Sequence, residues 1–271
     1  MPHPFDPGYS REPFRTLCED YPGTEAYPGS EFRVEWGPIF HRGRLDGSAR
    51  VLVIGQDPAQ HETVVRRILV GAAGRRLQGY LAKLGITRSY VLINAFLYSV
   101  YGKITTAASN NPLLVAYRHR WLDALILGQQ TEAVITLGTW AKKAWQTWAA
   151  TPQGQSMNLT VASITHPTQP ESSSNGDEAK LAAATKALLK NWNAGLEKLA
   201  PAISHPDQPV PLVLYGDAFA EGDYAPIPST DLPAGVPAWM YEKGGWAQRV
   251  GSDARAKRAN ITITVPKEVL P

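Results

Sequence analysis

Four short apolar runs, rich in β-branched residues, constrain the fold of this chain more than any other feature. They span residues 50–54 (RVLVI), 90–93 (YVLI), 133–137 (AVITL) and 160–164 (TVASI). Their apolarity is continuous rather than alternating, which is typical of strands buried on both faces of a parallel sheet. Longer segments with helical patterns separate them, and this alternation predicts crossover connections between parallel strands.

The helical segments complete this pattern. Residues 61–85 and 111–128 are predicted crossover helices, and Pro112 suits the start of the second one, directly after Asn110 or Asn111. After the fourth run, Asp177 can cap a helix whose apolar residues fall three or four apart. These are Leu181, Ala184, Leu188, Trp192, Leu196 and Leu199. We therefore predict an α/β fold, a three-layer α/β/α sandwich with a central, mainly parallel four-stranded sheet plus a C-terminal extension.

The chain divides into three predicted parts. Residues 1–48 form an N-terminal segment that packs on the core, residues 49–200 form the α/β domain, and residues 201–271 form a Pro/Gly-rich extension. Within the extension, residues 209–219 and 261–265 are candidates for short strands. We expect the extension to cover part of the core. The alternative is a DNA-contacting flap that uses four basic residues, Arg249, Arg255, Lys257 and Arg258.

Composition narrows the class of protein. With 271 residues, of which 44% are hydrophobic, the chain can bury a sizeable core, and its net charge of +3 only mildly favours a polyanionic partner. The single cysteine, Cys18, excludes an intrachain disulfide and a four-cysteine cluster within this chain. The N-terminal residues lack a secretory pattern, and no apolar run approaches the ~20 residues of a membrane span. We expect a cytoplasmic monomer with no membrane partner.

Polar residues of catalytic type follow three of the four predicted strands. Asp57 comes after the first run, Asn94 after the second and His166 after the fourth. Ligands of open parallel sheets bind beyond the carboxyl ends of the strands, so these side chains are expected on one rim. Each residue alone is explained by turn or capping chemistry. Their joint placement favours a functional site.

The residues around these positions resemble the uracil-DNA glycosylases. Gly55-Gln56-Asp57-Pro58 is similar to the first signature of that superfamily, and His166-Pro167-Thr168 is similar to the second. Further similarity to the iron-sulfur members of the superfamily occurs at Glu62, residues 69–77, residues 90–94 and Gly102. The resemblance covers about residues 50–200 and implies that the α/β domain is a glycosylase-like catalytic domain.

Several positions depart from the superfamily pattern. Ala59-Gln60 stands where Tyr-His is common, and that tyrosine helps to exclude thymine. The aromatic residue that stacks on the base in relatives falls at Leu69, so Phe96 or Tyr98 is the alternative. Residues 169–171 (QPE) offer no Leu or Arg wedge, and the cluster-binding cysteines are missing. No cofactor and no metal is therefore expected.

Strand-end placement and the resemblance together imply roles for the site residues. Asp57 would stabilise the cationic sugar and orient water, while neutral His166 and backbone N–H groups near Gln56 would bind O2 of the departing base. Asn94 would read the edge of the uracil. The remaining residues expected to bind uracil are Gly55, Ala59, Leu69 and Phe96. Those expected to contact DNA are Arg66, Arg67, Arg75, Arg76, Lys103, Arg118, Thr168 and Gln169, with solvated helix faces as the alternative for each arginine and lysine.

The predicted function is hydrolysis of the N-glycosidic bond of uracil in single- or double-stranded DNA, releasing free uracil and leaving an abasic site for base excision repair. One alternative is a protein that binds uracil or abasic sites in DNA with weak catalysis. Another is a glycosylase for a different lesion, such as hypoxanthine or uracil mispaired with guanine. A small-molecule-binding α/β protein is disfavoured, because no Gly-rich phosphate loop follows the first strand.

Overall fold

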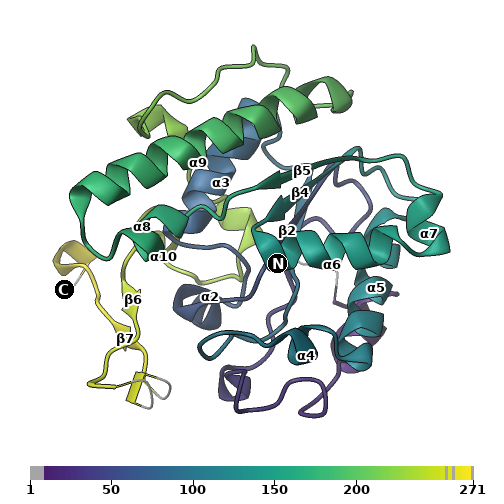
Figure 1. The fold of residues 1–271 in the computed structure, drawn as a ribbon, viewed down its shortest axis with the longest axis horizontal. Coiled ribbons are helices and arrows are strands. Elements are labelled where there is room, and N and C mark those ends of the chain that lie inside the picture. The colour runs from purple at the N-terminus through teal and green to yellow at the C-terminus, as the bar shows by residue number, and fades with distance from the viewer. Residues whose placement is uncertain (1–8, 254–255, 258–259, 270–271) are drawn as a thin grey trace.

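The computed structural model describes residues 9–253, 256–257 and 260–269 and contains a central sheet of five strands (Figure 1). In chain order the strands are β1 (His41–Gly43), β2 (Val51–Gly55), β3 (Tyr90–Asn94), β4 (Ala133–Leu137) and β5 (Thr160–Ile164). Their spatial order is β1-β3-β2-β4-β5, parallel except for β1, which runs antiparallel to β3. The four predicted strands are confirmed. The edge strand β1 was not predicted, because its three residues, HRG, form no apolar run.

Helices cover both faces of this sheet, which confirms the three-layer sandwich. Side chains alternate across β2, so Leu52 and Ile54 pack with α1 (Phe14–Glu19), α5 (Pro112–Ile126) and α6 (Thr139–Ala149). Val51 and Val53 face the opposite layer, formed by α3 (Ala72–Lys83) and α9 (Glu178–Leu199). The shorter α-helices are α2 (Gln60–Val65), α4 (Thr106–Ser109), α7 (Pro152–Gln155), α8 (Gln169–Ser174) and α10 (Trp239–Glu242). Single 3₁₀ turns span Val34–Trp36, Ala200–Ala202, Glu221–Asp223, Ser229–Asp231 and Lys267–Val269.

Two predicted helices begin at the predicted capping residues. The Asn111 side chain accepts a hydrogen bond from the Leu113 N–H at 3.0 Å, and Pro112 occupies the first turn of α5. The Asp177 carboxylate accepts from the Lys180 N–H at 3.0 Å at the start of α9. The inner face of α9 buries Trp192 completely. Local capping chemistry and apolar spacing therefore fix both helices.

The predicted single helix over residues 61–85 is wrong, because the chain breaks it into α2 and α3. Arg66 and Leu69 in the connection have positive φ values of 62° and 52°, and Gly71 follows with 81°. A left-handed residue ends an α-helix, and apolar spacing does not reveal it. The connection is also tight, since a Cβ on Gly74 would overlap the Leu69 carbonyl oxygen. This break separates α2 from α3.

The C-terminal extension contains one of its two predicted strands. Residues 261–265 include β7 (Thr262–Ile263), which pairs antiparallel with β6 (Ala247–Gln248). Residues 209–219, all described, contain no strand. The backbone of Tyr215 pairs instead with a side chain of α9, since its N–H donates to Asn193 Oδ1 at 2.8 Å and its carbonyl accepts from Asn193 Nδ2 at 2.9 Å. The side-chain amide of Asn193 on α9 thus forms the two hydrogen bonds that a neighbouring strand would otherwise form with Tyr215.

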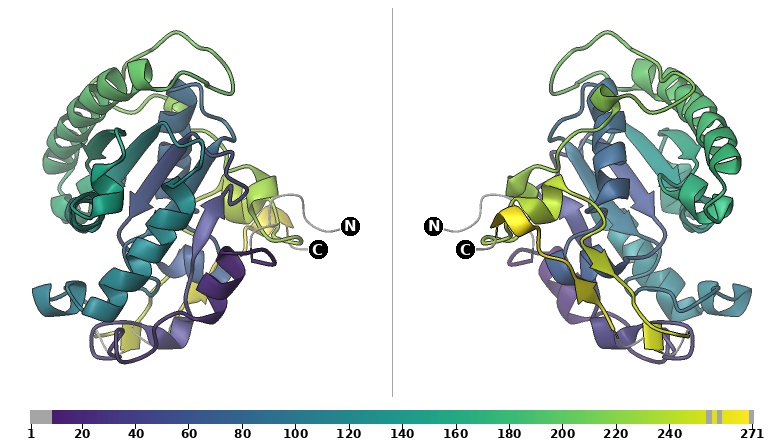
Figure 2. Two further views of the ribbon diagram at one scale, coloured as in Figure 1. Left: turned by 90° about the vertical axis from the view of Figure 1, so that its right-hand side faces the viewer. Right: turned by 90° about the vertical axis from the view of Figure 1, so that its left-hand side faces the viewer.

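A buried ion pair attaches the extension to the core. Arg42 Nη1 lies 3.0 Å from Asp231 Oδ2, both side chains are at most 1% exposed, and the Tyr90 hydroxyl donates to the same oxygen. Apolar residues of the extension, including Trp246, pack on Val65 and Val70. Figure 2 shows the yellow end of the extension away from α9, whereas the earlier part around Tyr215 contacts α9. The domain boundaries at residues 48 and 200 stay a prediction.

Replacing Asp231 tests this attachment. The change Asp231→Ala leaves the Arg42 guanidinium buried without its counter-charge, so we expect the free energy of unfolding to fall by about 3–5 kcal/mol in urea titrations. The control is Asp217→Ala, which breaks an exposed pair with Lys186 and should cost under about 1 kcal/mol. Equal effects of the two substitutions would contradict a stabilising role of the buried pair.

Candidate active site

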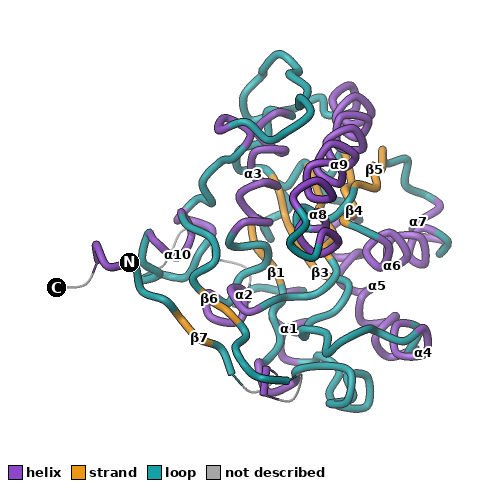
Figure 3. The backbone as a smooth tube through the Cα atoms, turned by 60° about the vertical axis from the view of Figure 1, so that its left-hand side comes forward, coloured by secondary structure: helices purple, strands orange, loops and turns teal. Residues whose placement is uncertain are grey.

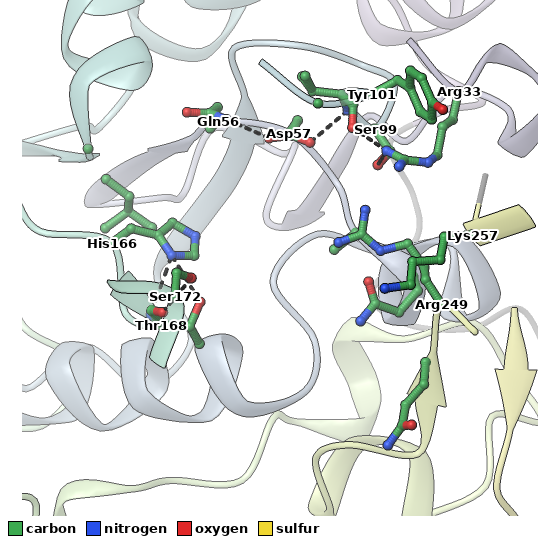
Figure 4. Close-up of a pocket in the computed structure, with 17 residues that line it drawn as sticks. Arg33, Gln56, Asp57, Ser99, Tyr101, His166, Thr168, Ser172, Arg249 and Lys257 are labelled. Atoms are coloured by element: carbon green, nitrogen blue, oxygen red, sulfur yellow. Dashed lines mark hydrogen bonds between the residues drawn. The ribbon is translucent and has the colours of Figure 1, made fainter. Parts of the chain in front are cut away.

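A cavity of about 1020 Å³ lies at the carboxyl ends of the parallel strands (Figure 4). Two predicted catalytic residues line this cavity. Asp57 comes from the segment after β2, and His166 comes from the segment after β5. These two residues are 109 positions apart in the sequence, and the parallel sheet brings them to the same edge. Gln56, Ala59 and Thr168 also line the cavity, as predicted from the sequence. The large opening at this rim is the candidate active site.

The Asp57 carboxylate is fixed by hydrogen bonds on both oxygens. Oδ2 accepts from the Val100 N–H at 2.8 Å, and Oδ1 accepts from Gln56 Nε2 at 2.9 Å. Burial raises the pKa of this carboxyl above its ordinary value, although these two hydrogen bonds and the charges of Arg249 and Arg33 oppose the shift. The result is an oriented carboxylate that binds a proton more readily than a free aspartate does.

His166 is held in one tautomer by the residue two positions on. Its Nδ1 accepts from the Thr168 N–H at 3.4 Å and lies 3.2 Å from Thr168 Oγ1. Since a backbone N–H can only donate, we assign the ring proton to Nε2. Burial lowers the pKa of His166 to about 4, so the ring is neutral at pH 7. A neutral imidazole with Nε2–H is a hydrogen-bond donor without a charge.

Both helices of one layer hold the loop that carries His166. From α3, Arg76 donates to the Pro167 carbonyl at 2.7 Å and to Glu171 Oε1 at 2.6 Å. From α9, Asn191 Oδ1 accepts from the Thr165 N–H at 2.7 Å. These contacts fix the backbone on both sides of the imidazole.

A comparison with known families agrees with this geometry. The sequence profile of the uracil DNA glycosylase superfamily matches residues 42–196, more than half of the chain. The chain belongs to the uracil DNA glycosylase superfamily. No curated protein matches the sequence. Membership places the protein among DNA-repair hydrolases of the glycosylase type, with DNA as the partner. The matched region contains Asp57 and His166 but excludes the extension.

Four residues that we expected to bind the base do not line the cavity of this glycosylase: Gly55, Asn94, Leu69 and Phe96. Asn94 is buried beside Gly55, where a Cβ on the glycine would overlap its amide oxygen, and it faces a separate small cavity. Phe96 is 1% exposed and packs on Phe32 in the core. Leu69 is buried in the opposite core cluster. The two core positions follow from apolar packing, so base stacking by Leu69 or Phe96 has no support in this geometry.

Most arginines expected to contact DNA are engaged within the protein. Arg66 donates to the carbonyls of Trp36 and Pro38 at 2.7 and 2.6 Å, and Arg76 holds the His166 loop. Arg75 lies over the Tyr224 ring, and Arg118 is buried with its guanidinium 3.4 Å from the Ala95 carbonyl. Arg67 also donates to a carbonyl, whereas Gln169 and Lys103 are exposed. Hydrogen bonds within the protein hold Arg66, Arg67, Arg76 and Arg118, and a pattern of charges in the sequence does not reveal such bonds.

Three further residues that line the cavity are cationic. Arg33, only 4% exposed, donates to Ser99 Oγ at 3.4 Å and to the Val100 carbonyl, and lies 5.0 Å from the Tyr101 ring centre. Arg249 lines the cavity from the extension, as does Lys257. Arg33 lies outside the resemblance and gave no sequence signal. Arg249 and Lys257 belong to the alternative of a DNA-contacting flap, whose Arg255 and Arg258 lie outside the described residues.

Neither a membrane-spanning helix nor a metal-binding cluster occurs in the part of the chain that the structure describes. No described helix is both long and apolar enough to cross a bilayer. No group of three or more His, Cys, Asp or Glu among the described residues is arranged to hold a metal ion.

Glu62 stabilises the turn behind the first signature. Its carboxylate accepts from the Ala59 N–H at 3.0 Å and from the Val70 N–H at 3.2 Å, which joins the start of α2 to the connection before α3. Burial raises the pKa of this carboxyl to about 7, and the neighbouring Asp57 charge adds to the shift. Glu62 therefore titrates near neutral pH.

This pKa predicts a pH-dependent stability. The folded state binds the Glu62 proton more tightly than the unfolded state, so this group favours folding below about pH 4.5 and loses that contribution as the pH rises to about 7. We expect the unfolding free energy of the wild type, relative to Glu62→Gln, to fall by up to about 3 kcal/mol between pH 4.5 and 8 in urea titrations. The same comparison with Glu197→Gln, an exposed position on α9, should show no such trend. A constant difference for Glu62→Gln would refute the raised pKa.

Proposed function

We propose that the protein hydrolyses the N-glycosidic bond of deoxyuridine in DNA, releasing uracil and leaving an abasic site. The observation that carries this proposal is the meeting of an oriented carboxylate and a neutral imidazole donor at one cavity. The cavity is at the upper end of the about 300–1,000 Å³ that ligand pockets occupy, which suits an extruded nucleotide. A base inside a duplex is unreachable, so the nucleotide must leave the stack first.

Asp57 acts on the sugar in this mechanism. When the C1′–N1 bond breaks, its electron pair leaves with the base and positive charge develops on the sugar ring. The Asp57 carboxylate stabilises that charge, orients a water toward C1′ and accepts a proton as the new C1′–O bond forms. Hydrogen bonds from the Val100 N–H and Gln56 keep the carboxylate in place throughout.

His166 acts on the base. The departing uracil carries negative charge on N1 and O2, and the Nε2–H of His166 donates a hydrogen bond to O2. The lowered pKa of His166 keeps the ring neutral, so the site contains no imidazolium before the reaction. Burial strengthens this hydrogen bond, because the local dielectric constant around the ring is lower than that of water.

Asn94 recognises the uracil edge from behind Gly55. In this proposal its amide accepts from N3–H and donates to O4, and cytosine presents the reverse pattern at a cost of about 1–3 kcal/mol per unpaired group. The amide lies behind Gly55 and does not line the cavity, so in this proposal it moves past Gly55 to reach the base. The ring of Tyr101, which lies on the cavity wall, supplies the stacking surface.

A second candidate is a glycosylase with a broader range of bases. Ala59 lines the cavity and is exposed, at the position where the superfamily pattern has a thymine-excluding tyrosine. A small side chain there leaves room for thymine or for a larger deaminated base such as hypoxanthine. A protein that binds uracil without cleaving it is less favoured, because Asp57 and His166 both face the cavity.

Base release from oligonucleotides distinguishes these candidates. We expect alkali-labile abasic sites in DNA containing uracil, and a loss of about 10²–10⁴-fold in rate for Asp57→Asn, with DNA binding retained. Oligonucleotides carrying hypoxanthine or a thymine·guanine mispair, tested in parallel, measure the base range. Near-normal release by Asp57→Asn would overturn the mechanism, and binding without any release would favour the uracil-binding alternative.

A further inference from the structure

Three cationic side chains line one side of the candidate active site and have no role in the proposed chemistry. Arg33 comes from the N-terminal segment, and Arg249 and Lys257 come from the extension. Figure 4 shows Arg249 and Lys257 across the cavity from His166 and Thr168. We call these three residues the cationic wall.

The cationic wall lacks carboxylate partners. Among the described residues, no carboxylate lies within ion-pair distance of Arg33, Arg249 or Lys257. Arg33 is almost fully buried, its Nε has no hydrogen-bond partner, and the nearby charge of Arg249 repels it. Asp57 attracts both arginines and Glu35 attracts Arg33, but only at distances longer than an ion pair. A buried, unpaired guanidinium beside a second cation is costly, and an anion between them would remove the cost.

The extension holds its part of the wall against α2. The Ala247 N–H donates to His61 Nε2 at 3.3 Å, and the His61 ring packs edge-on against Trp246 with centres 4.8 Å apart. Trp246 Nε1 donates in turn to the Met240 carbonyl at 2.9 Å. Figure 3 shows β6 lying beside α2, the helix that begins three residues after Asp57. The position of Arg249 is therefore coupled to the position of the first signature.

We propose that the cationic wall binds backbone phosphates of the DNA strand on either side of the extruded nucleotide. This inference rests on the proposed function and adds the extension to the substrate-binding surface. Guanidinium groups match phosphate oxygens in geometry, and a phosphodiester is the anionic group that every DNA substrate brings to this cavity. Binding of the phosphates offsets the cost of extruding the base.

The salt dependence of DNA binding tests the proposal. In the full chain carrying Asp57→Asn to prevent turnover, we would titrate a uracil-containing single-stranded 15-mer by fluorescence anisotropy from 50 to 300 mM KCl. Adding Arg249→Gln and Lys257→Gln should lower the slope of log K against log[KCl] by about 1.4, since each lost contact to a single strand removes about 0.7. The charge-conserving pair Arg249→Lys and Lys257→Arg should retain the slope. Lys190→Gln, exposed on α9 away from the cavity, should not change it.

The outcomes separate this inference from the proposed function. An unchanged slope in the Gln double variant, with base release intact in the chain that retains Asp57, would overturn the cationic wall alone. If the Gln and the charge-conserving double variants lose the same amount of slope, the substitutions disturb the fold. That result would also overturn the proposed cationic wall. A third outcome is possible. If the chain that retains Asp57 releases no uracil, the glycosylase activity is rejected. The phosphate site is retained if the slope of log K against log[KCl] falls only in the Gln double variant.

Discussion

The proposed chemistry depends on an Asp57 carboxyl that stays ionisable just beyond a fully buried strand. Every residue of β2 is buried, and Asp57 stands two positions after it, where burial penalises its charge. The Val100 N–H comes from the segment after β3, the strand beside β2, and compensates part of that penalty. Gln56 compensates a further part. The parallel pairing of two strands thus positions the group on which the proposed chemistry depends.

The sheet and much of its helical cover could be predicted, because their signals are local. Continuous apolar runs identified β2 to β5, and capping residues identified the starts of α5 and α9. The strand β1 could not be predicted, since the partners that allow Arg42 to be buried, among them Asp231, 189 positions away, are distant in the sequence. The break after α2 was missed because positive φ at Arg66 and Leu69 depends on tertiary contacts.

The candidate site was predictable only in part. Strand-end position and family resemblance pointed to Asp57 and His166, and the structure brings both to one cavity. Asn94 occupies the corresponding end of β3, yet its side chain turns under Gly55 rather than onto the cavity wall. Arg33 carried no local signal and Arg249 belonged only to the alternative of a DNA-contacting flap, since only the folded chain brings its N-terminal segment and its extension together. Long-range packing, which the sequence pattern does not encode visibly, decides these positions.

The extension acts as a structural partner of the catalytic core. Asp231 joins it to β1 through Arg42, and Ala247 joins it to α2 through His61. Asp231 and Ala247 lie outside the residues that match the superfamily, whereas their partners Arg42 and His61 lie within them. A segment with little regular structure can therefore shape the site through a few specific contacts.

The most direct test of the account is a crystal structure of the full chain carrying Asp57→Asn with a uracil-containing oligonucleotide bound. We predict the uracil extruded into the cavity, with its O2 about 3 Å from His166 Nε2 and the sugar C1′ facing residue 57. A uracil that remains stacked in the strand, or binds away from His166, would contradict the central claim that these two side chains act on one extruded nucleotide.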